Sequence, residues 1–309
     1  MRRYRFPSLF CAVCLALSLL PPTTAQSAIF RFQSDLDQAD EFGQSSVFDP
    51  VGLLVGTDAT GASFVAGSGV LIDPHWVLTA GHVPFQTGST LFESLRFSTS
   101  ADTLNNLDTF TDADLFFSFP GYDRNVPAGL GDDIGLVRLA NPITDITPAN
   151  RFFGQDVIGA EFAIAGYGNP GVFGSPTGDF DGVRRGGQNA GDSFGFNLGL
   201  INIEDQFWVF DFDRFDSGGP LALEWQGSRN DSGGGWFIDV NGEFQLAGIT
   251  SGGISNDLNT FAIRTSLYNE WIDDTIAANS TAVPEPGTLV LLSVGMMYLA
   301  GKRRRRHSP

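Results

Sequence analysis

The amino-acid sequence predicts an all-β fold, a barrel or a sandwich, and three observations lead to this prediction. From about residue 50 to about residue 275, short apolar runs are separated by Gly and Asp, as in strands joined by tight turns. The 309 residues include 38 Gly and 28 Phe, and long helical periodicities are scarce. The runs expected to form strands are VGLLVG, GSGVLID, WVLTAG, DIGLVRL, EFAIAGYG, WFIDV and FQLAGITS.

The remaining segments are expected to add one helix, long loops and a leader. The helix is expected over residues 265–278 (TSLYNEWIDDTIAA), with Thr265 or Ser266 as its cap. Its apolar side chains fall roughly on one face: Leu267, Trp271, Ile272 and Ile276. Residues 168–200 are rich in Gly, Asp and Asn and are expected to be surface loops. Residues 26–50 are polar and acidic, so we interpret them as an acidic leader or an edge segment.

The N-terminus has the pattern of a secretory signal peptide. A basic start is followed by an apolar run and a small-residue exit, which predicts cleavage after Ala25 and a signal peptide over residues 1–25. The alternative is an N-terminal membrane anchor. Both cysteines, Cys11 and Cys14, lie in this segment. The mature protein is therefore expected to have no disulfide bond despite an oxidising destination.

The C-terminus is similar to the PEP-CTERM sorting signal of bacterial surface proteins. A linker over residues 279–287 contains Pro-Glu-Pro, and residues 288–309 hold a short apolar run and a cluster of basic residues. The apolar run, Thr288 to Gly301, is shorter than the roughly 20 residues of an independent membrane span. The resemblance implies that a membrane sorting enzyme acts on this short transmembrane tail and that the protein reaches the cell surface or the exterior. A plain C-terminal anchor is the alternative.

The charge of the chain excludes nucleic acid as a partner. The formal net charge is −17, with 18 basic and 35 acidic residues. Eight of the basic residues lie at the two ends, so the body is more acidic still. A phosphate backbone would be repelled by such a surface.

One histidine and one aspartate have the sequence context of a catalytic pair. His82 directly follows the apolar run WVLTAG, and Asp133 precedes the apolar run IGLVRL. His75 is the other histidine of the body. A buried carboxylate needs a partner, and an imidazole oriented by a carboxylate is the base that a serine nucleophile requires.

Four motifs in order are similar to those of the trypsin-like (chymotrypsin-fold) serine proteases. They are GSGVLIDPHWVLTAGH, DDIGLVRL, DSGG and LAGITSGG, and the protease domain they imply spans residues 51–278. The resemblance implies two six-stranded antiparallel β-barrels and a short C-terminal helix. It also implies that His82 is the general base, Asp133 its orienting carboxylate and a DSGG serine the nucleophile. The acid immediately precedes Ile in the family pattern, which selects Asp133 over Asp132.

The DSGG motif occurs twice, with Ser217 in the first copy and Ser232 in the second. After Ser232 the chain reads as one strand, an Asn-Gly turn and a second strand, which matches the hairpin of the family without a gap. The residue before the second copy, Asn230, adopts positive φ more readily than Phe215 does. Pro220 favours the first copy, because the family usually has Pro at that position. We therefore predict Ser232 as the nucleophile and keep Ser217 as the alternative.

The resemblance also assigns residues around the nucleophile. The backbone N–H groups of Asn230 and Ser232 would form the oxyanion hole. Asp231 is expected to be buried beneath the turn and to need a cationic partner. In relatives activated by cleavage that partner is a new N-terminal amine, and here Arg229 is a candidate.

The primary substrate pocket depends on which serine is the nucleophile. With Ser232, the matching floor residue is Gln226 and the walls are Ser251, Gly252 and Gly253, which suggests no strong charge preference. With Ser217, the floor residue is Asp211, which would favour Arg or Lys before the cleaved bond. Asp211 in a solvated acidic loop is the simpler interpretation.

Two functions are consistent with these residues. The first is a secreted, surface-sorted serine endopeptidase that acts on protein or peptide substrates. The second is a non-catalytic binding or structural module of the same fold. No cofactor and no catalytic metal are expected, although the loop GDFDG (178–182) offers acidic residues for a structural Ca²⁺.

Overall fold

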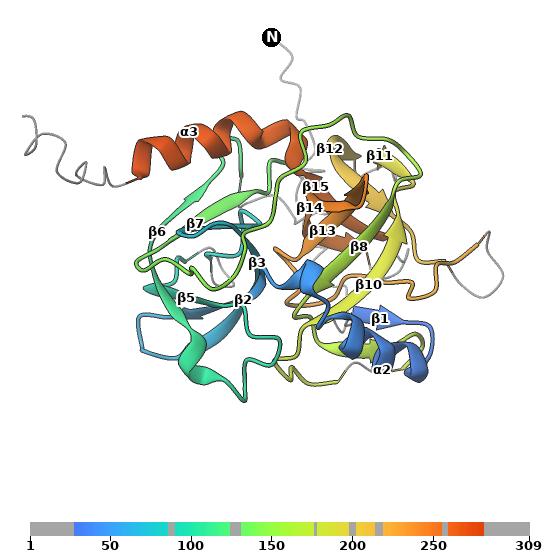
Figure 1. The fold of residues 1–309 in the computed structure, drawn as a ribbon, viewed down its shortest axis with the longest axis horizontal. Coiled ribbons are helices and arrows are strands. Elements are labelled where there is room, and N and C mark those ends of the chain that lie inside the picture. Colours follow the sequence, from blue (N-terminus) through green and yellow to red (C-terminus); the bar gives the residue numbers. More distant parts are fainter. Residues whose placement is uncertain are drawn as a thin grey trace, which may run out of the picture. The chain divides into compact units, whose positions relative to one another are not determined.

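The computed structural model describes residues 28–85, 90–123, 131–175, 178–197, 202–213, 219–254 and 259–280. Most of the strands lie in two antiparallel β-structures, which Figure 1 shows side by side. The signal peptide, residues 216–218 of the first DSGG copy and the sorting tail lie outside the described residues.

The first β-structure is a closed barrel of six strands. Its order is β2-β3-β4-β7-β6-β5, and β5 pairs with β2 to close it. Side chains that point inward from successive strands, among them Leu54, Val70, Leu78 and Phe97, are fully buried. The strands are β2 (Val51–Thr57), β3 (Ser63–Asp73), β4 (Trp76–Thr79), β5 (Ser94–Ser98), β6 (Thr111–Ser118) and β7 (Gly135–Leu139), and a 3₁₀ turn (Leu107–Thr109) precedes β6.

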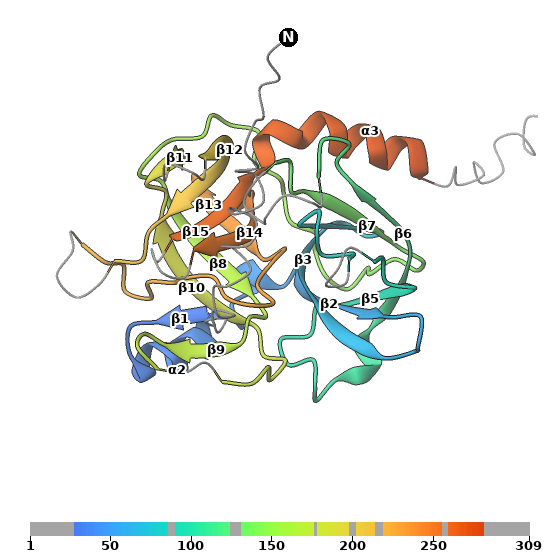
Figure 2. The same ribbon diagram turned by 180° about the vertical axis from the view of Figure 1, so that it is seen from behind.

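The second β-structure is a curled half-barrel of seven strands, in the order β10-β8-β13-β14-β15-β12-β11. The predicted all-β fold of two antiparallel β-structures is confirmed, and the second differs from the expected six-stranded barrel in having seven strands that do not close. Figure 2 shows this half-barrel from behind. The strands are β8 (Glu161–Gly166), β10 (Arg185–Ala190), β11 (Ser193–Asn197), β12 (Asn202–Phe210), β13 (Gly235–Val240), β14 (Glu243–Ile254) and β15 (Asn259–Arg264).

Two of these strands, β10 and β11, lie in the segment that the sequence predicted to be loop. The strand β10 has few apolar side chains because glycines are needed there for close packing. A Cβ atom at Gly186 would lie 2.8 Å from the ring of Phe48, and one at Gly187 would lie 2.5 Å from Trp225. Backbone pairing with β8 and close packing hold β10 in place. Neither requires the alternation of apolar and polar residues by which a strand is recognised in a sequence.

Aromatic side chains form the core of the half-barrel. The rings of Phe210 and Trp236 stack with their centroids 3.8 Å apart, and Phe162 contacts both rings edge-on. Trp225 meets Trp236 edge-on at 5.4 Å. Because the body of the chain has no cysteine, this packing takes the place that disulfide bonds have in many secreted domains.

The segment before the first barrel is packed against the half-barrel, which the prediction of an acidic leader did not anticipate. Strand β1 (Ala28–Phe30) pairs in parallel with β9 (Pro170–Val172), as the edge-segment alternative allowed. Helix α2 (Gln33–Phe42) and a 3₁₀ turn (Ser46–Phe48) follow. Phe30, Ala39 and Phe48 are fully buried. A few apolar anchors at wide spacing thus hold a segment whose composition is otherwise acidic.

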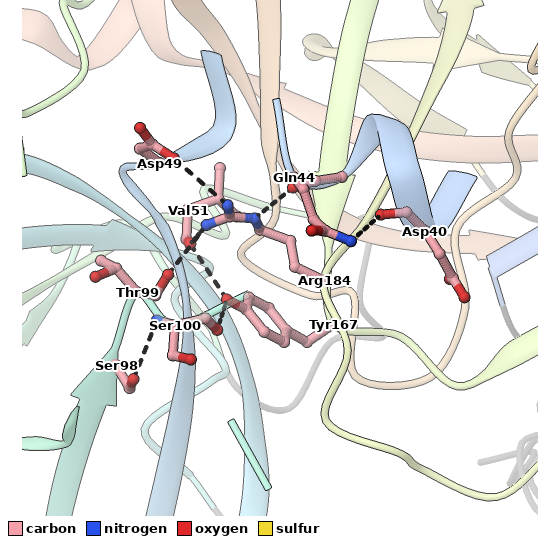
Figure 3. Close-up of polar contacts among 10 residues, drawn as sticks. Asp40, Gln44, Asp49, Val51, Ser98, Thr99, Ser100, Tyr167 and Arg184 are labelled. Carbon is pink, nitrogen blue, oxygen red and sulfur yellow. Dashed lines mark hydrogen bonds and ion pairs between the residues drawn. The ribbon is translucent and has the colours of Figure 1, made fainter. Parts of the chain in front are cut away.

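A buried polar cluster joins this segment to both β-structures (Figure 3). Arg184, just before β10, donates to the carbonyl oxygens of Gly43 at 2.8 Å, Val51 at 2.9 Å and Thr99 at 3.1 Å. Tyr167, just after β8, donates its hydroxyl to the carbonyl of Ser100 at 2.7 Å. Burial raises the pKa of Tyr167 to about 12, so this hydroxyl stays a donor.

The helix expected over residues 265–278 is confirmed, with a 3₁₀ first turn (Thr265–Tyr268) followed by α3 (Asn269–Asn279). Ile272 is buried, whereas Leu267 is 54% exposed because the 3₁₀ turn breaks the 3.6-residue spacing. Within the described ranges, no helix has the length and apolar composition needed to cross a bilayer.

Candidate active site

His82 and Asp133 lie at the same end of two paired strands. Strands β4 and β7 are antiparallel with Thr79 opposite Gly135, so residues just after β4 adjoin residues just before β7. Asp133 accepts from the backbone N–H of His82 at 2.9 Å, and its other oxygen lies 2.8 Å from Nδ1 of the imidazole. The neighbouring Asp132 instead accepts from the hydroxyl of Tyr268 at 2.6 Å. The geometry therefore joins Asp133, and not Asp132, to His82.

The two side chains of this pair have shifted pKa values. Burial favours the neutral form of His82, but the charge of Asp133 and its hydrogen bond outweigh burial and raise the pKa of His82 above its ordinary value. Burial also favours neutral Asp133, yet His82 and the hydroxyl of Ser251 lower its pKa overall. The aspartate is 1% exposed and the histidine side chain 29% exposed. An ionised Asp133 thus holds the proton of His82 on Nδ1 and leaves Nε2 as an acceptor.

Ser251 contacts both Asp133 and Ser232. A β-bulge between Thr250 and Gly252 turns Ser251 out of the ladder of β14 and β15. Its hydroxyl donates to Asp133, and its carbonyl accepts from the hydroxyl of Ser232 at 3.5 Å. Sequence reasoning placed Ser251 in a pocket wall and missed its bond to Asp133.

Ser232 lies in the tight turn that precedes β13. The expected hairpin after it is confirmed: Asn241 and Gly242 have φ values of 57° and 88° and join β13 to β14. Gly233 has a φ of 88°, and a Cβ atom there would overlap the carbonyl of Ser68. The backbone N–H of Ser68 donates to the carbonyl of Ser232 at 2.7 Å. The alternative nucleophile, Ser217, lies outside the described residues.

Asn230 has the positive φ that the sequence predicted, with a value of 77°. Its side-chain amide donates to Oδ1 of Asn169 at 2.7 Å, and its carbonyl accepts from the hydroxyl of Ser68 at 3.0 Å. Asparagine is one of the few residues other than glycine that tolerate this backbone region.

Asp231 is buried, as expected, and its hydrogen-bond partners among the described residues are uncharged groups. Its two oxygens accept from the N–H of Gly168 at 2.7 Å, the N–H of Ser228 at 2.9 Å and the hydroxyl of Ser228 at 2.7 Å. The expectation of a cationic partner, with Arg229 as candidate, is therefore wrong. Burial raises the pKa of Asp231 to about 6 because these three donors and the more distant Arg185 only partly offset the loss of water.

A pocket of about 360 Å³ opens beside Ser232. Its walls include the aromatic side chains of Phe64, Phe85 and Phe92, and Arg229 and Asn230 complete the rim. Arg229 thus faces a cavity next to Ser232 rather than Asp231.

The residues expected to form the primary pocket do not line the pocket beside Ser232, although one of them, Ser251, contacts Ser232. Gln226 is 3% exposed, and its backbone exchanges two hydrogen bonds with Ile29 of β1. Within the described residues its Oε1 atom has no hydrogen-bond partner. Gly252 and Gly253 belong to β14, and a Cβ atom at Gly253 would lie 2.6 Å from the carbonyl of Asn259.

Asp211, the floor residue of the alternative pocket, lies in an acidic cluster. Its N–H donates to Asp192 at 2.7 Å. Burial, together with the charges of Asp192 and Asp213, raises the pKa of Asp211 to about 6.

The GDFDG loop has one acid already paired. Asp181 accepts from Arg185 at 3.0 and 2.7 Å. Nowhere in the described ranges do three His, Cys, Asp or Glu side chains gather as a metal would require. A structural Ca²⁺ in this loop stays a prediction, which melting curves with and without a chelator would test.

Comparisons with known proteins agree with this geometry. Among solved structures, GrC matches with a TM-score of 0.57 and 16% identity, over 75% of this chain and 96% of its own. Neuropsin, a serine protease expressed in the limbic system of mouse brain, matches with a TM-score of 0.54 and 19% identity over the same shares. At these identities the likeness establishes the fold alone. The search of curated proteins found no match.

Two family models match the sequence. Residues 282–306 match the PEP-CTERM protein-sorting motif, which indicates export and surface sorting. Residues 55–272, more than half of the chain, match the model described as Trypsin. The chain therefore belongs to the trypsin family, with a PEP-CTERM sorting motif at its C-terminus.

Proposed function

We propose that the protein is an exported, surface-sorted serine endopeptidase that hydrolyses peptide bonds through His82, Asp133 and Ser232. The observation that carries this proposal is the position of Ser251, which bonds to Asp133 with its hydroxyl and to Ser232 with its carbonyl. One residue thus ties the acid to the nucleophile, and the acid is bonded to His82.

The proposed reaction begins at the hydroxyl of Ser232. Rotation of this side chain exchanges its long bond to Ser251 for one to Nε2 of His82. The imidazole takes the proton as the oxygen attacks the substrate carbonyl, and ionised Asp133 stabilises the imidazolium that forms.

The negative oxygen of the tetrahedral intermediate is bound by the backbone N–H groups of Asn230 and Ser232. His82 then gives its proton to the leaving amine, which departs and leaves an acyl-enzyme on Ser232. A water molecule, deprotonated by His82, attacks the acyl group and restores the free serine.

The substrate is a protein or peptide. With Gln226, rather than an acidic residue, as the expected floor of the primary pocket, no strong charge preference is expected. The signal-peptide pattern of residues 1–25 and the sorting motif support a site of action outside the cytoplasm. A membrane sorting enzyme acts on the tail after export, and no cofactor is required.

The test is digestion of denatured casein by the purified mature protein. We expect peptides to appear with the wild type and to be lost in His82→Ala and Ser232→Ala, with unchanged circular dichroism in both variants. A folded wild type that releases no peptides would favour the non-catalytic binding or structural module instead.

A further inference from the structure

The segment that follows β8 forms hydrogen bonds to each of the three residues that precede Ser232. The N–H of Asn169 donates to the carbonyl of Arg229 at 3.1 Å, and Oδ1 of Asn169 accepts from Asn230 at 2.7 Å. The N–H of Gly168 donates to Asp231 at 2.7 Å. All three residues before the nucleophile are therefore held from this one segment.

The bond to Arg229 fixes the direction of the Asn230 N–H. In a trans peptide the carbonyl of one residue and the N–H of the next point in opposite directions within one plane. Because Asn169 holds the Arg229 carbonyl on one side, the Asn230 N–H is directed to the other. Rotation of this peptide would break the bond to Asn169.

The side-chain bond between Asn169 and Asn230 adds a second restraint. Asn230 has a φ of 77°, a region that disfavours any residue with a Cβ atom. The hydrogen bond from its side-chain amide to Asn169 stabilises the observed conformation and offsets this conformational cost. Asn169 is itself oriented, because its Nδ2 donates to the carbonyl of Gly178 at 3.2 Å.

We propose that Asn169 is a positioning residue, which holds Asn230 in the left-handed conformation that directs its N–H into the oxyanion hole. This inference rests on the proposed function, because it requires an acyl-transfer reaction at Ser232. Asn169 touches neither substrate nor reacting atoms and acts through Asn230.

The test is a double-mutant cycle read out by the rate at which a fluorophosphonate labels Ser232. Removing an oxyanion-hole donor lowers the reaction rate roughly 10²–10³-fold. Asn169→Ala leaves the Asn230 N–H in place but less firmly oriented, so it is expected to slow labelling about tenfold. In the hydrolysis of a p-nitrophenyl ester, kcat is expected to fall by a similar factor while KM changes less than about twofold.

The second arm of the cycle uses Asn230→Gly, which has no side chain to anchor and no penalty at positive φ. Adding Asn169→Ala to Asn230→Gly is expected to change the labelling rate less than about twofold. Asn105→Ala is the matched control. This exposed asparagine is not part of the turn, and its side-chain amide donates to Asp102 at 2.7 Å, so its replacement should leave the labelling rate unchanged.

The outcomes separate this inference from the proposed function. A folded wild type that is not labelled would refute the proposed function. A labelled wild type in which Asn169→Ala has no effect, or the same effect in both backgrounds, would refute the role of Asn169. If Asn169→Ala does not fold, Asn169→Ser provides the same comparison with a side chain too short to reach Asn230.

Discussion

Asp133 accepts two hydrogen bonds from His82, from the backbone N–H at 2.9 Å and from the ring Nδ1 at 2.8 Å. The first fixes where the histidine lies, and the second fixes which ring nitrogen carries the proton. Since Asp133 is ionised and nearly inaccessible to water, its charge is directed at the imidazole.

The pH dependence of activity follows from this pair. In the proposed reaction His82 acts as a base only when it is neutral, and its pKa lies above its ordinary value of 6.5. The rate of fluorophosphonate labelling is therefore expected to rise with pH and to reach half its maximum above pH 6.5. Asp133→Asn removes the raising charge but not the burial, so it should lower the midpoint and slow labelling by roughly 10³-fold or more. A wild-type midpoint clearly below that of free histidine would contradict this assignment.

Ser251→Ala tests the link between the acid and the nucleophile. The variant leaves a buried carboxylate with one donor fewer, which should reduce the free energy of unfolding by about 1–3 kcal/mol. The labelling rate should also fall, by about tenfold, because Asp133 is then less firmly oriented. Ser63→Ala, at an exposed position of β3, is the control and should change neither quantity. Equal behaviour of the two variants would show that the Ser251 hydroxyl has no part in the site.

The stability of the fold is expected to fall as pH rises, opposite to the activity. Burial is the main cause of the raised pKa values, about 6 for Asp231, about 6 for Asp211 and about 7 for Glu224. The folded protein therefore binds protons that the unfolded chain releases, and the free energy of unfolding decreases between about pH 4 and pH 7. For Asp231, a change from 3.8 to about 6 corresponds to about 3 kcal/mol.

Melting temperatures at about pH 5 and pH 8 measure this effect, and the value at pH 5 should be the higher. Asp231→Asn should reduce the difference. Asp58→Asn is the control, because hydrogen bonds in its exposed turn lower the pKa of Asp58 and it titrates below this range. A melting temperature that increases from pH 5 to pH 8 would contradict the raised pKa values of these carboxyl groups.

Arg184 is expected to be essential for joining the two β-structures. Arg184→Ala removes the guanidinium donors from the carbonyls of Gly43, Val51 and Thr99 and should lower the free energy of unfolding, measured in urea, by about 3 kcal/mol or more. Arg138→Ala breaks a more exposed pair with Asp114 and should cost about 1 kcal/mol or less. Similar losses in the two variants would mean that the buried cluster contributes no more than a surface ion pair.

The sequence predicted those features that leave local signals. The Asn241-Gly242 turn and the positive φ of Asn230 follow from the residue types that this backbone region allows. The proximity of His82 to Asp133 was expected from matching motifs, and the pairing of β4 with β7 explains it.

What the sequence did not predict depends on contacts between distant segments. Strand β10 has the composition of a loop because Gly186 and Gly187 let Phe48 and Trp225 approach. Two of the three donors to Asp231 are backbone N–H groups, which every sequence contains, so no residue pattern could indicate them. The burial of Phe30 likewise depends on a surface formed by strands far along the chain.

The most direct test of the account is to label the purified mature protein with a fluorophosphonate and map the modified residue by peptide mass spectrometry. The account predicts an adduct on Ser232 that is lost in His82→Ala and retained in Ser217→Ala. An adduct on Ser217 would contradict it and would direct attention to Asp211 as the floor of the substrate pocket.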